Sequence, residues 1–339
     1  MIYTMPSDRT RPAVATACVM QTRLRSPRAD ILLDAALYTG SARRKRAREG
    51  IDQSWLNHQH RELTWALTDS GYVADGDVEG LRTILTQSAT AHDRAQARSK
   101  GVLAALPLAV SWLTNRADAL VAALNRIGTP VAIMLEHERD PLGEAGAVDG
   151  LINVLSAEVP VAVLRSDTSI LGGLAHGAAA VSVGDYPALR HIYPARTGPR
   201  GGRGGQPPVS TLVPALLRYV NLDKIDAGVT AAPDLAMWTC RCRVCHGRRL
   251  DWISDSTQPG IYAFEHAVSA LAASARALFA DISSSAWPVR WCDAVRDAMA
   301  AHASLITRTG SSKTWRVPEG LRRWFIHYER HGPPTTVPH

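Results

Sequence analysis

Between residues 29 and 195 the chain alternates short apolar runs with amphipathic stretches, and this alternation constrains its fold more than any other feature. The apolar runs predict strands at 31–37, 63–67, 102–108, 130–135, 160–164 and 178–183. Apolar residues three or four positions apart predict helices at 78–98, 116–127, 147–157 and 169–177. Repeated βα units form parallel sheets, which are either doubly wound or closed into a barrel. We expect an α/β protein built on a (β/α)8 TIM-type barrel.

The length of 339 residues is enough for about two domains, or for one barrel with an appendage. Hydrophobic residues make up 46% of the chain, which excludes a disordered or fibrous protein. Residues 1–28 are polar and contain several prolines, so we expect little regular structure there, with the barrel core at 29–195. Segment 196–208 is rich in glycine and arginine, which predicts a mobile loop or linker. We expect 209–339 to complete the barrel and to form a zinc-binding helical subdomain with a basic tail.

The sequence shows no membrane or export signal. No run approaches 18 consecutive apolar residues, and the first 20 residues include Asp8, Arg9 and Arg11 where a signal peptide would need an apolar stretch. We therefore expect a cytoplasmic protein without a membrane partner.

The charge balance favours a polyanionic partner. There are 38 basic and 31 acidic residues, a net charge of +7. Five cations fall within 43–48, and they form either a solvated helix face or a ridge that binds phosphates. In the tail, at 313–331, arginines alternate with aromatic residues. That pattern suits stacking on unpaired bases, and it also suits a terminal helix docked on the core.

Three of the five cysteines fall within six residues, in the pattern C-x-C-x-x-C at Cys240, Cys242 and Cys245. Crowded thiols in a cytosolic chain indicate a metal site, although three buried free thiols are the alternative. Zinc prefers four tetrahedral thiolate and imidazole ligands, and we choose His266, within the predicted helix 262–282, as the fourth. Four protein ligands leave no open position, so we expect a structural Zn2+ site.

Carboxylates follow four of the predicted strands. They are Asp69, Glu136, Asp167 and Asp185. Active sites of (β/α)8 barrels lie at the carboxyl ends of the strands, so we expect these four side chains on the catalytic face.

The order of Asp69-Ser70-Gly71-Tyr72, a βα barrel, C-x-C-x-x-C and a helical histidine resembles the tRNA-guanine transglycosylase family. These enzymes replace a guanine in nucleic acid with a 7-deazaguanine base. The resemblance implies that Asp69 contacts the base with Ser70 and Gly71 beside it. It also suggests that Tyr72 stacks on the base, although a core aromatic at a strand edge is equally consistent, and Asp-Ser-Gly is also a common turn.

The segment 171–177 reads LGGLAHG, which is similar to the base-recognition loop of the same family. The resemblance therefore makes Gly172 and Gly173 substrate-binding residues. The alternative is a helix that packs closely on a strand.

Family members form a covalent intermediate through a second aspartate that attacks the ribose C1′. Asp167 and Asp185 are the candidates here, with Asp167 preferred, while Asp69 would move protons on the purine. A helix N-cap is the competing interpretation for either candidate, and the strict register places Ser182 at the family position. The expected function is thus base exchange in DNA or tRNA through an aspartyl-linked glycosyl intermediate.

The resemblance also implies a homodimer, and differences from the tRNA-type motif favour a DNA-modifying branch. Two other functions remain open. One is a non-catalytic, zinc-containing subunit that binds nucleic acid, and the other is an unrelated barrel enzyme that acts on a small molecule.

Overall fold

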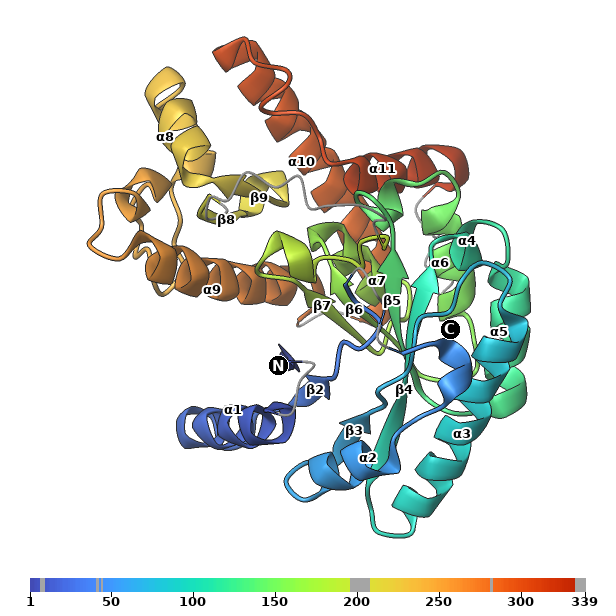
Figure 1. Cartoon of the computed structure of the whole chain (residues 1–339). Coiled ribbons are helices and arrows are strands. Elements are labelled where there is room, and N and C mark those ends of the chain that lie inside the picture. Colours follow the sequence, from blue (N-terminus) through green and yellow to red (C-terminus); the bar gives the residue numbers. More distant parts are fainter. Residues whose placement is uncertain (7–9, 41–42, 44, 196–207, 281–282, 333–339) are drawn as a thin grey trace.

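A computed structural model describes residues 1–6, 10–40, 43, 45–195, 208–280 and 283–332. It is an α/β structure (Figure 1). The strands are β1 (Ile2–Thr4), β2 (Leu32–Asp34), β3 (Trp65–Leu67), β4 (Gly101–Ala109), β5 (Val131–Glu136), β6 (Val161–Ser166), β7 (Ala180–Val183), β8 (Ser210–Val213) and β9 (Arg218–Asn221). The α-helices are α1 (Arg11–Arg25), α2 (Gln53–His60), α3 (Val78–Gln96), α4 (Ser111–Thr114), α5 (Ala117–Ile127), α6 (Ala147–Leu155), α7 (Leu171–Ala175), α8 (Leu222–Ala231), α9 (Pro259–Phe279), α10 (Trp287–Thr309) and α11 (Glu319–His331). Each of the six predicted strands and four predicted helices of 29–195 overlaps an observed one, so these predictions are confirmed.

Local sequence signals set several helix ends. The carboxylate of Asp77 caps α3 by accepting the backbone N–H of Gly80. Helix α5 ends at Gly128, whose φ of 74° is readily adopted only without a side chain. Asp77 thus marks the start of α3, and Gly128 ends α5 shortly before β5 begins.

The central sheet is a curled, half-barrel layer of five parallel strands in the order β3-β4-β5-β6-β7 (Figure 1). Neighbours in the sheet are also neighbours in the sequence, as in a (β/α) barrel. A closed eight-stranded barrel, however, is not seen in the described part of the chain, and this corrects the expectation of a full (β/α)8 barrel. Strands β1 and β2 form a separate parallel pair, with β2 beside β3.

The strands after β7 do not extend the sheet. Residues 196–207, where a linker is predicted, lie outside the described residues. Beyond them β8 and β9 pair as an antiparallel hairpin that packs on α9. Because the apolar side chains of this hairpin are used in a second core around the cysteines, they are not available to close a barrel.

The first 28 residues were predicted to hold little regular structure, and this is wrong. They contain β1 and α1. Pro12 lies in the first turn of α1, where its missing N–H costs nothing, so the proline that suggested irregular chain in fact starts a helix. Ala15 and Val19 of α1 are buried against the β1–β2 pair.

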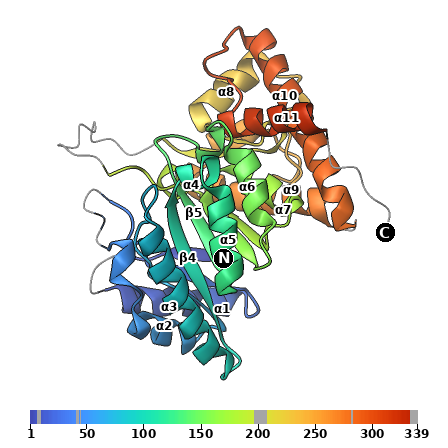
Figure 2. The same ribbon diagram turned by 90° about the vertical axis from the view of Figure 1, so that its right-hand side faces the viewer.

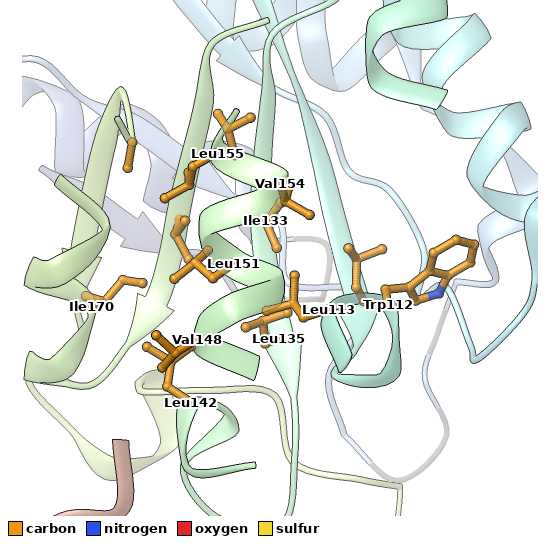
Figure 3. Packing of buried hydrophobic residues seen from close by; sticks show 14 of the residues in the cluster. Trp112, Leu113, Ile133, Leu135, Leu142, Val148, Leu151, Val154, Leu155 and Ile170 are labelled. Carbon is orange, nitrogen blue, oxygen red and sulfur yellow. The ribbon is translucent and has the colours of Figure 1, made fainter. Parts of the chain in front are cut away.

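Side chains alternate between two faces of the sheet. On the inner face Ala105, Ala132 and Ala162 lie opposite one another across β4, β5 and β6, and these small side chains leave room for the sheet to curl. On the outer face Ile133 and Leu135 of β5 pack against α6 (Figure 3). The outer face of the sheet is therefore covered by helices. The inner face is lined by small and apolar side chains.

Helix α10 connects the sheet to the C-terminal subdomain, and α11 packs beside α10 on the sheet side (Figure 2). Near its start α10 buries Trp291 and Val295 in the main core, and near its end it buries Leu305 in the core around the cysteines. Helix α11 packs its buried Trp324 against α7 and α10, and also contacts α6. No helix in the described ranges is both long and apolar enough to cross a bilayer.

Candidate metal centre and candidate active-site pocket

The cysteine motif forms a tight turn closed by backbone hydrogen bonds. Cys240 accepts a bond from the N–H of Gly247 and donates to the carbonyl of Arg248, while His246 donates to the carbonyl of Cys242. His246 and Gly247 both have positive φ, which reverses the chain direction. The turn therefore points its three thiols to one side.

The structure brings Cys240, Cys242, Cys245 and His266 together. Their ligand atoms all lie within 4.8 Å of one another, and all four residues are buried. Nδ1 of His266 is 3.2 Å from Sγ of Cys245 and 3.5 Å from Sγ of Cys242. Sulfur and nitrogen ligands of one tetrahedral zinc ion are separated by about 3.6 Å, so the cluster is close enough to hold a metal ion.

Contacts around the cluster orient its ligands. Nε2 of His266 donates to the carbonyl oxygen of Leu212 over 2.7 Å, which directs the lone pair of Nδ1 toward the thiols. The backbone N–H groups of Cys242 and Cys245 donate to the sulfurs of Cys240 and Cys242, and the indole N–H of Trp252 donates to the sulfur of Cys245. These donors stabilise thiolates, which are the form that binds metal.

The thiols also influence one another's ionisation. Contact with Cys245 lowers the pKa of Cys240, whereas contact with Cys240 raises the pKa of Cys245. Burial by itself would lower the pKa of His266, but contacts with Cys240 and the Leu212 carbonyl raise it to about 8. A positive ion at the centre would replace these shared protons.

The predicted Asp-Ser-Gly-Tyr motif follows β3. Asp69 is 4% exposed, and both carboxylate oxygens have partners: Nζ of Lys45 donates to Oδ2 over 2.7 Å, and the backbone N–H of Asp52 donates to Oδ1 over 2.8 Å. Ser70 is hydrogen-bonded to the hydroxyl of Thr68. A Cβ at Gly71 would meet the backbone of Arg46 at 2.3 Å, so only glycine allows the two chain segments this approach.

Tyr72 is half-buried at the same edge of the sheet. Its hydroxyl donates to Glu136 over 2.8 Å, and the guanidinium of Arg43 lies 3.4 Å from its ring centre while pairing with the same glutamate. These contacts join the ends of β3 and β5. The motif thus lies at the carboxyl edge of the sheet, as predicted, with its polar groups bonded to neighbouring segments.

Asp167 lies in a pocket of about 350 Å³ at the end of β6. It caps the following turn by accepting the N–H of Thr168, yet its side chain is 31% exposed. The other residues that line the pocket include four arginines and further ionisable groups: Arg139, Arg190, Arg218, Arg316, His137, Asp140, Glu144, Glu319 and Tyr219. Asp167 therefore acts as an N-cap and also faces a pocket in which four arginines and four carboxylates meet.

Arg190 is held in place toward Asp167. Its guanidinium bonds the carbonyls of Gly184 and Asp185, stacks 4.0 Å from the ring centre of Tyr219, and approaches Oδ2 of Asp167 to 4.0 Å. Arg218 is fixed from the other side by the carbonyls of Thr314 and Arg316. Arg190 and Arg218 are thus fixed by contacts with backbone carbonyls.

Asp140 is a second carboxylate of this pocket, and it is not one of the four carboxylates expected at the strand ends. Burial and the charge of Asp167 raise the pKa of Asp140 to about 7, even though the N–H groups of Leu142 and Gly320 donate to it. In the sequence, Asp140 could be singled out only by its position in the loop that follows the strand β5. Arg218 also had a signal, because it interrupts the apolar run 209–220.

A bulge directs the end of β6. The register against β7 shifts between Val163 and Ser166, and Arg165 has φ of 53°. Arg165 consequently turns inward, where its Nη1 lies 3.4 Å from the carboxylate of the buried Asp34. The chain then leaves the sheet with Asp167 at the pocket.

The remaining predicted residues lie elsewhere. Asp185 follows β7 and lines a different pocket with Tyr186 and Phe264, and Tyr219 borders both pockets. A Cβ at Gly172 would meet Trp291 and Trp324 at 2.4 and 2.5 Å, and Gly173 packs near Ile170 and Val181. Gly172 thus allows α7 to pack closely on the tryptophans, in line with the alternative interpretation, while a Cβ at Gly173 would make ordinary van der Waals contacts.

Several cations of the first basic segment form ion pairs, and the tail contributes a docked helix. Arg43 and Lys45 pair with Glu136 and Asp69, and Arg48 pairs with Asp77, while Arg44 lies outside the described residues. In the tail α11 is docked on the core, as one of the two interpretations expected.

Searches against protein-family models, curated proteins and solved structures found no match for this chain.

Proposed function

We propose that this protein exchanges a base in nucleic acid, replacing guanine with a 7-deazaguanine derivative, and that Asp167 is the nucleophile. The observation that carries the proposal is the pocket at the end of β6, where Asp167 and Asp140 lie among four arginines. Carboxylates supply the nucleophile and the acid for glycosyl transfer, and the arginines suit the phosphates of the substrate. The order of sequence motifs that resembles the tRNA-guanine transglycosylases supports the same chemistry.

In the proposed reaction a carboxylate oxygen of Asp167 attacks C1′ of the target nucleotide, and the bond from C1′ to N9 of guanine breaks. Asp140, whose pKa of about 7 keeps a proton available near neutral pH, protonates the departing base. The incoming base then attacks C1′ through its own ring nitrogen, gives up its proton to the carboxylate of Asp140, and releases Asp167. The target nucleotide must leave the base stack before its C1′ can reach the pocket.

A second pocket, of about 640 Å³, supports the nucleic-acid partner. It shares Arg218, Arg316 and Val317 with the first pocket and adds Lys313 and Arg322. Arg322 is partly neutralised by Glu319 at 3.6 Å. This continuous basic track would bind phosphates beside the reacting nucleotide, because cations gain affinity by releasing counterions.

Zinc is the metal that we propose for the cysteine cluster. Three thiolates and one imidazole are a typical structural zinc set, with no position left for water. Its role would be to stabilise the subdomain that carries β9, and so to hold Arg218 at the pocket.

Incorporation of labelled guanine and 7-deazaguanines into DNA and tRNA tests the proposal. Asp167→Asn is expected to reduce exchange to background, whereas Asp185→Asn should retain it. The pair is matched, because each aspartate accepts the N–H of the next residue and asparagine preserves that bond. Exchange that survives Asp167→Asn would overturn the assignment of the nucleophile.

One observation favours a second function, a non-catalytic subunit that binds nucleic acid. Both oxygens of Asp69, the predicted base-contacting residue, are already bonded to Lys45 and Asp52. This function predicts salt-dependent binding of DNA or tRNA by the wild-type protein and no exchange with any base.

A further inference from the structure

Helices α6 and α11 together carry a second group of metal-binding side chains, separate from the cysteines. We propose that Asp149, His327 and His331 bind a divalent transition-metal ion. The three residues offer ligand atoms that all lie within 4.8 Å of one another.

Helix geometry explains how the group forms. His327 and His331 are four residues apart on α11, so they lie one above the other, and their ring centres are 4.9 Å apart. Asp149 lies in the first turn of α6, and its Oδ1 is 2.6 Å from Nδ1 of His327. Asp149 and His327 are 178 positions apart in the sequence and are brought together by the packing of α11 on α6.

The ligand chemistry selects the ion. Two imidazoles and one carboxylate suit zinc, copper, nickel or ferrous iron, whereas magnesium and calcium prefer oxygen ligands. The contact of 2.6 Å is shorter than the roughly 3.4 Å between nitrogen and oxygen ligands of one tetrahedral ion. A shared proton accounts for the short contact, and the metal ion would replace that proton as the exposed carboxylate moves outward.

The surroundings form one closed side and one open side. The ring of His327 is in edge contact with Trp324 and Tyr328, and Tyr328 is itself hydrogen-bonded to His176. The side chain of Asp149 is 47% exposed, and that of His327 is 13% exposed. An ion could therefore enter from solvent and keep water on its outer face, unlike an ion held by the buried cysteines.

Metal titration of the untagged, full-length protein tests this site, with Co2+ as the probe. We expect two ions per chain. One should show a thiolate charge-transfer band from the cysteines, and the other should show only the weaker bands of nitrogen and oxygen ligands and be removed first by a chelator. His331→Gln and Asp149→Asn should each lose the second ion only.

His58→Gln is the matched control, because it removes a histidine from a short surface helix, α2, and should leave both ions bound. A wild-type protein that binds only the thiolate-ligated ion would overturn the proposal. So would a second ion that remains in the double variant Asp149→Asn/His331→Gln, provided that its circular dichroism matches the wild type. The experiment measures no base exchange, so its outcome is independent of the function proposed above.

Discussion

Nε2 of His266 donates a hydrogen bond to the carbonyl oxygen of Leu212 over 2.7 Å, and this bond joins the helix of the metal centre to strand β8. The imidazole therefore joins two parts of the subdomain, because Nδ1 faces the thiols of Cys242 and Cys245 while Nε2 is bonded to the strand.

His266→Ala is expected to reduce bound metal below one ion per chain and to unfold the subdomain around β8, β9 and α8. Structural zinc contributes about 10–16 kcal/mol in small domains, which is comparable with the whole stability of a domain, about 5–15 kcal/mol. Metal analysis and thermal unfolding measure the effect. Cys18→Ala, which removes a cysteine outside the cluster, should change neither. A fully metal-loaded His266→Ala protein would contradict the assignment of the fourth ligand.

The contribution of His176 to the stability of the protein should fall as the pH falls from about 6.5 toward 4. Burial, together with the nearby His327, lowers the pKa of His176 to about 4. The unfolded chain has the ordinary value of about 6.5 and so binds more protons in this window. This contribution is fully present above pH 6.5 and is lost as the pH falls.

The variant His176→Gln should show a shallower dependence of unfolding free energy on pH between 6.5 and 4. His191, whose pKa burial also lowers to about 4, retains part of the slope in that variant. Denaturant unfolding at several pH values measures the difference, and identical slopes for the two proteins would count against the buried, neutral imidazole.

Arg316→Ala should weaken nucleic-acid binding to a similar extent for every sequence. Loss of one phosphate contact lowers the slope of log K against log salt by about 1. Binding measured over a range of salt concentrations tests this, with Arg126→Ala on the exposed face of α5 as the control. Equal slopes for Arg316→Ala and the wild type would exclude Arg316 from the phosphate track.

Gly172→Ala is expected to destabilise the protein by about 1–3 kcal/mol, because the added Cβ would collide with two buried tryptophans. Gly260 provides the control: its position in α9 has open space, so Gly260→Ala should be neutral or stabilising by up to about 1 kcal/mol. Thermal unfolding compares the two. A wild-type-like Gly172→Ala protein would show that α7 can move away from Trp291 and Trp324.

The central strands and helices could be predicted because their patterns are local. Apolar runs such as 130–135 need only be buried to become strands, and the periodicity of 116–127 fixes the buried face of a helix. Barrel closure was not predictable, because it depends on where β8 and β9 find a partner. Their apolar side chains serve equally well in a sheet and in the core around Trp238, and only the assembled subdomain decides between them.

The cysteine–histidine cluster could be predicted because three of its side chains lie close together in the sequence and His266 lies within a predicted helix. The pocket was harder to predict. Asp140, Arg190, Arg218 and Arg316 come from four distant segments, and no spacing rule connects them. Asp167 was found from its place at a strand end, while the contacts of Asp69 with Lys45 and Asp52 required the folded chain.

Helix α10 crosses from one core to the other without a break, with 23 residues and a length of about 35 Å. Because a continuous helix has no hinge, α10 fixes the orientation of the two cores relative to each other. A macromolecule bound to the subdomain around Cys240, Cys242 and Cys245 would therefore meet the carboxyl edge of the sheet at a fixed angle.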